Sequence, residues 1–161
     1  MAEVPARYAP QSKPEDFIAE PAAGADERID VGVLFVGGGP AGLAGAIRFN
    51  QLLGTAPDLK AQLGDTPVAV VEKGKYPGAH LVSGAVVNPI AFKMLFPDLP
   101  DSDFPFRTSV RGEAVYVMTA SGATRIPTPP TMKNHGYHSA SISEMARWLG
   151  EKAEGTGVMM L

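Results

Sequence analysis

The chain has 161 residues, of which 45% are hydrophobic and 19% are charged, and its formal net charge is −3. This length suits one domain with a substantial core, and the acidic balance argues against nucleic-acid binding, which usually requires a basic surplus. Cysteine is absent, so these residues cannot supply thiolate ligands to zinc or to an iron–sulfur cluster, and we assign no metal ligand among them.

The first part of the chain, residues 1–28, is rich in proline, alanine and acidic residues and has no sustained hydrophobic period. Such a composition is typical of an extended or disordered N-terminal arm. The opening residues MAEVPARYAP contain no apolar run and are not rich in arginine and serine, so the sequence predicts neither a secretory signal nor a transit peptide. We expect the folded part to occupy residues 29–161.

A strand, a turn, a helix and a second strand are predicted in close succession after the arm. Residues 29–36 (IDVGVLFV) are β-branched and apolar, as in a strand buried on both faces of a parallel sheet. The glycine-rich turn at residues 37–42 leads into a helix over residues 40–53, which a proline opens and a glycine follows. Residues 67–71 (PVAVV) form the second strand, closed by the acidic Glu72. This order predicts an α/β, Rossmann-like fold with a parallel sheet.

The turn contains the pattern G-x-G-x-x-G, formed by Gly37, Gly39 and Gly42. In a dinucleotide-binding turn the first glycine permits the tight bend and the second lets a pyrophosphate approach the backbone. The third glycine lets the helix pack closely against the strand. The helix N-terminus then presents free N–H groups and a partial positive charge to the phosphates. The strand before the turn and the helix after it supply the structural context that the motif requires.

An acid at the end of the second strand completes this pattern. We expect Glu72 to accept hydrogen bonds from the hydroxyl groups of the adenosine ribose. It lies thirty residues after Gly42, whereas the usual spacing is about 20, and the polar connection at residues 54–66 accounts for the excess. A carboxylate here would repel a 2′-phosphate, so the sequence favours FAD or NAD over a 2′-phosphorylated cofactor.

The remaining predicted elements are shorter. In chain order we expect a long loop at 73–88, a short helix at 89–96, a β-hairpin at 114–118 and 123–126 with its turn at 120–122, a turn-rich stretch at 127–137, an amphipathic helix at 141–154 and a strand at 158–161. Trp148 lies on the amphipathic helix, and we interpret it as a packing residue.

Three segments resemble a known family. VGGGPAGLAGAIRFNQLL, VVEKGKYPGAHLVSGAVVNPIAFKMLFPD and MKNHGYHSASISEMARWLGEKAEGTGV are similar to the N-terminal part of electron-transfer flavoprotein–ubiquinone oxidoreductases. The first segment is shared with many FAD and NAD proteins. The second, with the pattern E-K-x-x-x-x-G-A-H-x-x-S-G-A, is much more specific. The resemblance runs from Asp30 to Leu161.

The resemblance implies a FAD-binding domain of the glutathione-reductase type, of which residues 29–161 form an incomplete N-terminal portion with an added hairpin and helix. It also implies which residues contact FAD. On the ADP side these are Gly37, Gly39, Gly42 and Glu72, and on the flavin side they are Gly78, Ala79, His80, Ser83 and Gly84. We add Pro40, Ala41 and Lys73, which adjoin the ADP-side residues in the sequence, to the predicted cofactor-binding residues. We assign no catalytic acid, base or nucleophile, because the cofactor supplies the chemistry in such enzymes. From its residue type alone, His80 is interpreted as a loop histidine with one hydrogen bond.

A FAD-dependent oxidoreductase is the function that the resemblance implies. It would pass electrons from reduced electron-transfer flavoprotein, through FAD and a [4Fe–4S] cluster, to ubiquinone. The cluster and the peripheral membrane contact are expected in parts outside this chain. With no transit peptide predicted, we expect a bacterial-type protein on the cytoplasmic face of the inner membrane. Two alternatives stay open: a geranylgeranyl-reductase-like or monooxygenase-like flavoenzyme, and an inactive fragment that binds dinucleotide weakly or not at all.

Overall fold

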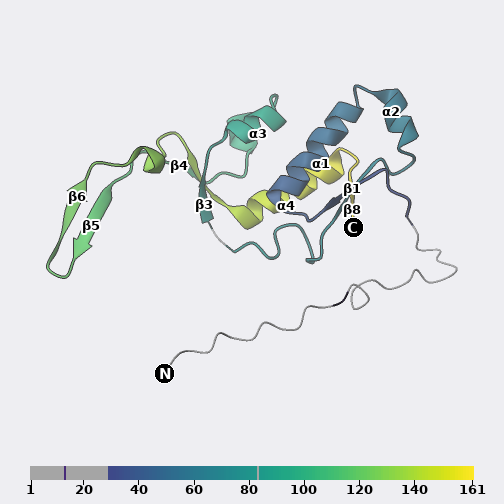
Figure 1. The fold of residues 1–161 in the computed structure, drawn as a ribbon. Helices are drawn as coiled ribbons and strands as arrows, with labels where there is room; N and C mark the ends of the chain where they lie inside the picture. Colours follow the sequence, from purple (N-terminus) through teal and green to yellow (C-terminus); the bar gives the residue numbers. More distant parts are fainter. Residues whose placement is uncertain (1–12, 14–28, 83) are drawn as a thin grey trace.

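The computed structural model of the chain describes residue 13 and residues 29–82 and 84–161. The extended arm predicted for residues 1–28 therefore lies outside the described residues, Lys13 excepted. The described residues form a mixed α/β structure in which two long helices lie side by side next to a small parallel sheet, and a hairpin projects from the far end (Figure 1).

The parallel sheet is built around the predicted strand–turn–helix–strand unit. In residues 29–82 and 84–161 it has the strand order β1 (Val33–Val36), β2 (Val68–Val71) and β8 (Met159–Met160). Helix α1 (Pro40–Leu53) and the short α2 (Pro57–Gln62) connect β1 to β2, while α4 (Ile142–Gly155) leads into β8. Both strand pairs are parallel. The predicted parallel sheet and the predicted α1 helix are confirmed.

Strand β1 differs from its prediction in length and in burial. Only Val33–Val36 of the predicted residues 29–36 is strand, because the ladder begins where Val33 pairs with Val68. The side chains of Leu34 and Val36 are 50% and 84% exposed. The expectation of burial on both faces was wrong for β1, because Leu34 and Val36 share one face of the strand and that face is exposed, while Val33 and Phe35 on the other face are partly buried. It is right for the central strand β2, whose first three residues are buried.

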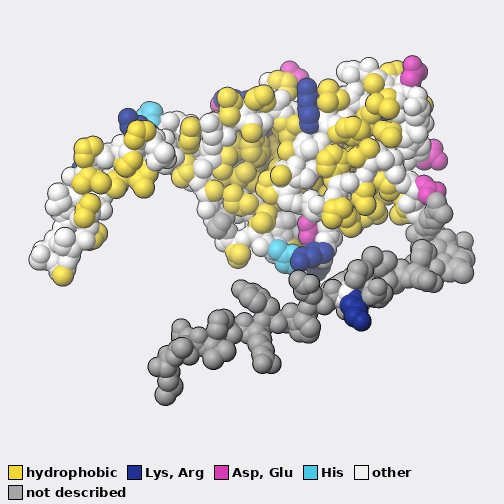
Figure 2. All heavy atoms as spheres, in the orientation of Figure 1, with side chains coloured by type: hydrophobic (Ala, Val, Ile, Leu, Met, Phe, Trp, Pro, Cys, Tyr) yellow, Lys and Arg dark blue, Asp and Glu magenta, His cyan; other side chains and the backbone are white. Residues whose placement is uncertain are grey.

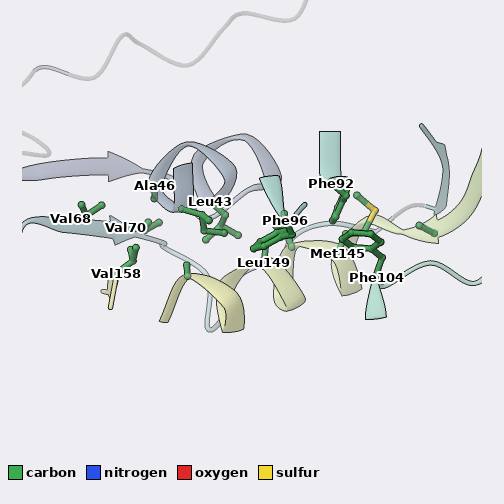
Figure 3. Packing of buried hydrophobic residues seen from close by; sticks show 14 of the residues in the cluster. Leu43, Ala46, Val68, Val70, Phe92, Phe96, Phe104, Met145, Leu149 and Val158 are labelled. Atoms are coloured by element: carbon green, nitrogen blue, oxygen red, sulfur yellow. The ribbon is translucent and has the colours of Figure 1, made fainter. Parts of the chain in front are cut away.

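The core lies between α1, α4 and the parallel sheet (Figure 3). On α1 the buried side chains follow the predicted helical period, and on α4 they line the side that packs against α1. The contributing residues include Leu43, Ala46 and Ile47 of α1, Met145, Ala146 and Leu149 of α4, and Val68 and Val70 of β2. The buried residues of both helices recur at helical spacing, as expected when one side of a helix faces a core.

Aromatic rings extend the core toward the short helix α3 (Ile90–Leu95). The Trp148 ring lies 5.9 Å from Phe92, 5.2 Å from Phe96 and 6.1 Å from Phe104, measured between ring centroids. Tilted and edge-on contacts of this kind stabilise beyond the apolar area that they bury. The prediction that Trp148 is a packing residue is confirmed.

A second, antiparallel sheet has the order β3 (Gly84–Val87), β7 (His138–Ser141) and β4 (Thr108–Ser109) among the described residues. Its strands pair across long stretches of sequence, for example Gly84 with Ser141. The prediction of a loop over residues 73–88 was therefore wrong at residues 84–87. Short strands that contain glycine or serine give little local signal, and here distant backbone pairing stabilises them.

The predicted hairpin is confirmed as β5 (Val115–Thr119) and β6 (Gly122–Ile126). It extends away from the helices (Figure 1) and carries apolar side chains on its surface (Figure 2). Val117 is 50% and Met118 73% exposed. The 3₁₀ turns η2 (Asp101–Asp103) and η3 (Pro130–Met132) lie outside the sheets. Among the described helices, none has the length and apolar character that a membrane span needs.

Candidate dinucleotide-binding site

The glycine-rich turn links β1 to α1 and requires glycine at two of its positions. Gly37 has φ +105°, a backbone conformation that residues with a side chain rarely adopt. Its N–H donates a hydrogen bond of 2.8 Å to the carbonyl of Val71, which extends the β1–β2 ladder into the turn. A Cβ on Gly42 would overlap the carbonyl oxygen of Gly37. The absence of a side chain at Gly42 therefore lets the start of α1 pack closely against the turn, as predicted for the third glycine of the motif.

Helix α1 begins directly at the end of this turn. Gly39 is the N-cap, with φ −78° and ψ 170°, and no side chain caps the helix. Pro40 opens the helix, and its first turn contains no acidic residue. A Cβ on Gly39 would meet no atom within 4 Å. The end of the helix thus offers uncapped N–H groups, a partial positive charge and open space, which together suit an anionic group.

Glu72, directly after β2, joins the turn to the loop that follows. One carboxylate oxygen, Oε1, accepts a hydrogen bond of 2.7 Å from the N–H of Gly74. The other, Oε2, accepts one of 2.8 Å from the N–H of Gly38. These two bonds, Gly74 first, lower the pKa of Glu72 below its ordinary value, and burial opposes the shift; Lys73, and His80 when it is protonated, add smaller contributions in the same direction as the bonds. The carboxylate is ionised at neutral pH and keeps lone pairs for further donors.

His80 lies beside this carboxylate. Its Nδ1 is 3.9 Å from Oε1 of Glu72, and its side chain is 62% exposed. The ring also covers Gly74, where a Cβ would lie 3.1 Å from the His80 Cε1. The structure thus places His80 next to the acid that was predicted to bind ribose, with the exposed Lys73 nearby in the chain.

The other residues predicted for the flavin side are farther along the same loop. Gly78 is buried, with φ +90°, and packs against the backbone of Ser143 in α4. Ala79 is exposed, and Gly84 is the first residue of β3, where it lines an open cavity of about 500 Å³ with residues of β3 and β7. Ser83 lies outside the described residues. The predicted site residues thus form two groups: the turn with Glu72 and His80, and the loop residues that lie near α4 and β3.

Two residues at the site were not predicted from the sequence. Gly38 and Gly74 supply the N–H groups that hold the Glu72 carboxylate. A Cβ on Gly38 would lie 3.0 Å from the Glu72 Cβ, so a glycine here lets the acid approach the turn. The sequence feature that could have identified Gly38 is its place inside the glycine-rich motif. For Gly74, the sequence feature is a small residue two positions after the acid.

Comparison with known proteins places these observations in context. No protein-family model matches the chain. It is 41% identical to the electron transfer flavoprotein-ubiquinone oxidoreductase of Pseudomonas aeruginosa in an alignment of 136 residues, which covers 82% of this chain and 24% of that protein. By sequence, the chain is related to the electron transfer flavoprotein-ubiquinone oxidoreductases. This confirms the resemblance that the motifs predicted.

Relatives with the same name come from distant organisms. The mitochondrial electron transfer flavoprotein-ubiquinone oxidoreductase of Dictyostelium discoideum is 42% identical over 126 residues, or 78% of this chain. That of Rattus norvegicus is 39% identical over 128 residues, also 78% of this chain. In both cases the match covers 20% of the relative. The chain therefore spans about a fifth to a quarter of the length of the curated relatives that it matches.

Proposed function

We propose that this chain binds the ADP half of FAD within an electron transfer flavoprotein-ubiquinone oxidoreductase. One observation carries the proposal: the ionised carboxylate of Glu72 stands at the end of β2 and contacts the glycine-rich turn through Gly38. This is the place where a dinucleotide-binding unit presents an acid to ribose. The names of the relatives support the choice of a flavin-dependent electron-transfer enzyme.

The residues at the turn fit FAD. The diphosphate would lie at the uncapped N-terminus of α1, in the open space beside Gly39. The ribose hydroxyls would donate to Glu72, and the exposed Lys73 would add positive charge. When bound, FAD would supply the electron-transfer chemistry, while the chain's own residues bind and orient it.

The fold supports the same assignment. The strand order β1-β2-β8, with α1 connecting β1 to β2, fits a Rossmann-like FAD-binding domain of the glutathione-reductase type. Residues 29–161 would then form its N-terminal part. The flavin ring would lie toward the second group of residues, which are Gly78, Ala79, Ser83 and Gly84.

The reaction proposed for the whole protein is electron transfer from reduced electron transfer flavoprotein, through FAD and a [4Fe–4S] cluster, to ubiquinone. The names of the relatives support the donor and the acceptor. Because this chain contains no cysteine, the cluster would be held by residues outside it. The cytoplasmic face of a bacterial inner membrane is the proposed location.

The described residues offer one surface for the peripheral membrane contact. The hairpin β5–β6 projects from the helices (Figure 1) and exposes Tyr116, Val117 and Met118. The residues from Val115 to Ile126 include no acidic side chain and one basic side chain, Arg125. Exposed apolar side chains on a projecting element favour insertion into the interface of a lipid bilayer. The hairpin would thus add to membrane contacts made elsewhere in the protein.

Titration of the 161-residue chain with ADP, FAD and FMN tests the proposed binding site. We expect ADP and FAD to bind with similar, weak affinities, because the contacts we propose involve the ADP half. FMN, which lacks that half, should not bind. Isothermal titration calorimetry measures all three, and the purified chain should retain little or no flavin absorbance. Stronger binding of FMN than of ADP would contradict the proposal.

A further inference from the structure

The loop that follows Glu72 passes over one side of α4. Residues 73–82 leave β2 and contact Ser143, Arg147 and Gly150. These helix residues are spaced by four and three positions, so they lie on one side of α4. We call them the loop-contact face. The core-facing side of the same helix carries other residues, among them Met145, Ala146, Leu149 and Ala153.

Gly78 makes the closest of these contacts. The hydroxyl of Ser143 donates a hydrogen bond of 2.9 Å to the carbonyl of Gly78. A Cβ on Gly78 would overlap the carbonyl oxygen of Ser143. Gly78 is buried and has φ +90°, so glycine is required there both for its conformation and for its closeness to the helix. The contact fixes the middle of the loop against the first turn of α4.

The two residues before Gly78 contact the next turns of the helix. A Cβ on Gly150 would lie 2.9 Å from Cγ and 3.2 Å from Cβ of Pro77, so the proline ring packs directly on the helix backbone. The Cζ of Arg147 lies 5.5 Å from the centre of the Tyr76 ring, within range of a cation–π contact. Three consecutive loop residues thus meet the three residues of the loop-contact face.

The residues on either side of this contact surround the Glu72 carboxylate. Gly74 precedes the contact and donates its N–H to Oε1. His80 follows the contact and lies 3.9 Å from the same oxygen. Because Gly74 and His80 each lie only two residues from this contact, the contact with α4 restricts both of them. The loop-contact face itself contacts Tyr76, Pro77 and Gly78. Through these residues it restricts where Gly74 and His80 lie relative to the Glu72 carboxylate.

We infer that the loop-contact face of α4 is a positioning surface for the nucleotide site, which holds Gly74 and His80 at Glu72 and so strengthens binding of the ADP half of a dinucleotide. Ser143 and Gly150 are then positioning residues. The part of this inference that concerns affinity rests on the function proposed for Glu72. The part that concerns the positions of Gly74 and His80 does not depend on that function. Affinity and loop geometry can be measured in separate experiments.

The first test needs no ligand. The variants are Ser143→Ala and Gly150→Ala in the 161-residue chain, and the titration of the Glu72 carboxyl group is followed by NMR. Both changes should displace the loop, weaken the Gly74 hydrogen bond and move the Glu72 titration to higher pH. The Gly74 hydrogen bond and a protonated His80 both lower the pKa of Glu72, so moving either away shifts the titration in the same direction, and the shift reports displacement of the loop.

Two matched controls carry the same chemical changes elsewhere. Gly155→Ala alters the last residue of α4, where a Cβ would meet nothing within 4 Å. Ser121→Ala alters the exposed turn of the hairpin. Neither should move the titration of Glu72. If Ser143→Ala and Gly150→Ala both titrate like the unaltered chain, the positioning inference is wrong, whatever the chain binds.

The second test measures ADP affinity by calorimetry. Ser143→Ala should weaken binding about two- to tenfold, the effect of one hydrogen bond. The loss should be smaller when Glu72 is already Gln, because coupled residues are not additive. Full additivity would contradict the inference. Gly150→Ala should also weaken binding, although alanine favours a helix more than glycine does. If the unaltered chain binds no ADP, the proposed function fails, while the NMR titration still decides the positioning role.

Discussion

Gly42, in the first turn of α1, lies directly against the carbonyl group of Gly37, just after β1. The contact leaves no room for a side chain, and it sets the distance between the strand and the start of the helix. The N–H groups of that helix start are the ones proposed to face a diphosphate. Packing within the turn and binding at the turn therefore depend on the same pair of residues.

Replacing Gly42 with alanine should destabilise the chain. The new Cβ would overlap the Gly37 carbonyl, and relieving such crowding costs about 1–3 kcal/mol. Chemical denaturation measures the loss, and ADP affinity should fall as well because the helix start is displaced. Gly112→Ala is the matched control, since a Cβ at Gly112 would meet nothing within 4 Å. Equal stability of the two variants would contradict this account of the turn.

Glu72→Gln should weaken binding of ADP and of FAD. A neutral amide accepts weaker hydrogen bonds from ribose hydroxyls than a carboxylate does. We expect about a tenfold loss, which corresponds to a free energy of about 1.4 kcal/mol. Glu154→Gln, an acid-to-amide change at an exposed position of α4, should leave affinity unchanged. If Glu72→Gln binds as tightly as the unaltered chain, Glu72 is not part of the nucleotide site.

The same residue should also contribute to stability in a pH-dependent way. The N–H groups of Gly74 and Gly38 lower the pKa of Glu72 in the folded chain below its ordinary value of 4.5. Folding therefore favours the ionised form. The stabilisation is complete above the pKa of the unfolded state, and it is lost as the pH falls through the lower pKa of the folded state.

Denaturation of the unaltered chain and of Glu72→Gln from about pH 6 to about pH 3 tests this linkage. Because other carboxylates titrate over the same range, the difference between the two proteins is the quantity to follow. It should be largest near neutral pH and shrink toward the acidic end. A difference that stays constant with pH would show that the two hydrogen bonds do not favour the ionised form.

The sequence predicts an element of this structure well when the pattern that specifies the element lies within or directly beside its own residues. Helix α1 was predicted with its observed bounds, Pro40–Leu53, because a proline opens it, an apolar period runs through it and a glycine directly follows it. Strand β2 and the hairpin have similarly local patterns. Strands β3 and β7 contain glycine or serine and have little local signal, and they form only when the two distant segments pair.

The same distinction applies to the candidate site. Gly37, Gly42 and Glu72 lie at positions fixed by the strand, the turn and the helix, so the motif identified them. The positions of Gly74 and Gly78 depend on the path of a loop across α4, and no local pattern encodes that path. The resemblance assigned Gly78 to the flavin side, and no local pattern indicated that Gly78 would also pack against Ser143 of α4.

The aromatic part of the core should account for a large share of stability. Phe92 is 8% exposed, and its ring lies 5.8 Å from Phe104 and 5.1 Å from Phe106. Phe92→Ala should lower the free energy of unfolding by about 3–5 kcal/mol. Met94→Ala in the same helix is the control, because Met94 is 74% exposed and should change stability by less than about 0.5 kcal/mol. Similar losses in both variants would contradict the assignment of Phe92 to the core.

The last prediction concerns the hairpin and lipid. Vesicles of phosphatidylcholine with phosphatidylglycerol should bind the chain in a flotation assay, and Met118→Asp should reduce the bound fraction about tenfold. Burying a methionine side chain is worth about 1.5–3 kcal/mol, and a carboxylate on the hairpin would also be repelled by anionic lipid.

Met94→Asp is the matched control for this assay, since it places the same charge at an equally exposed methionine of α3 (74%, against 73% for Met118). It should bind vesicles like the unaltered chain. Thermal unfolding of both variants shows that the fold persists, which is expected because the hairpin strands contact mainly each other. Equal loss of binding in the two variants would mean that general charge, rather than the hairpin, governs the interaction with lipid.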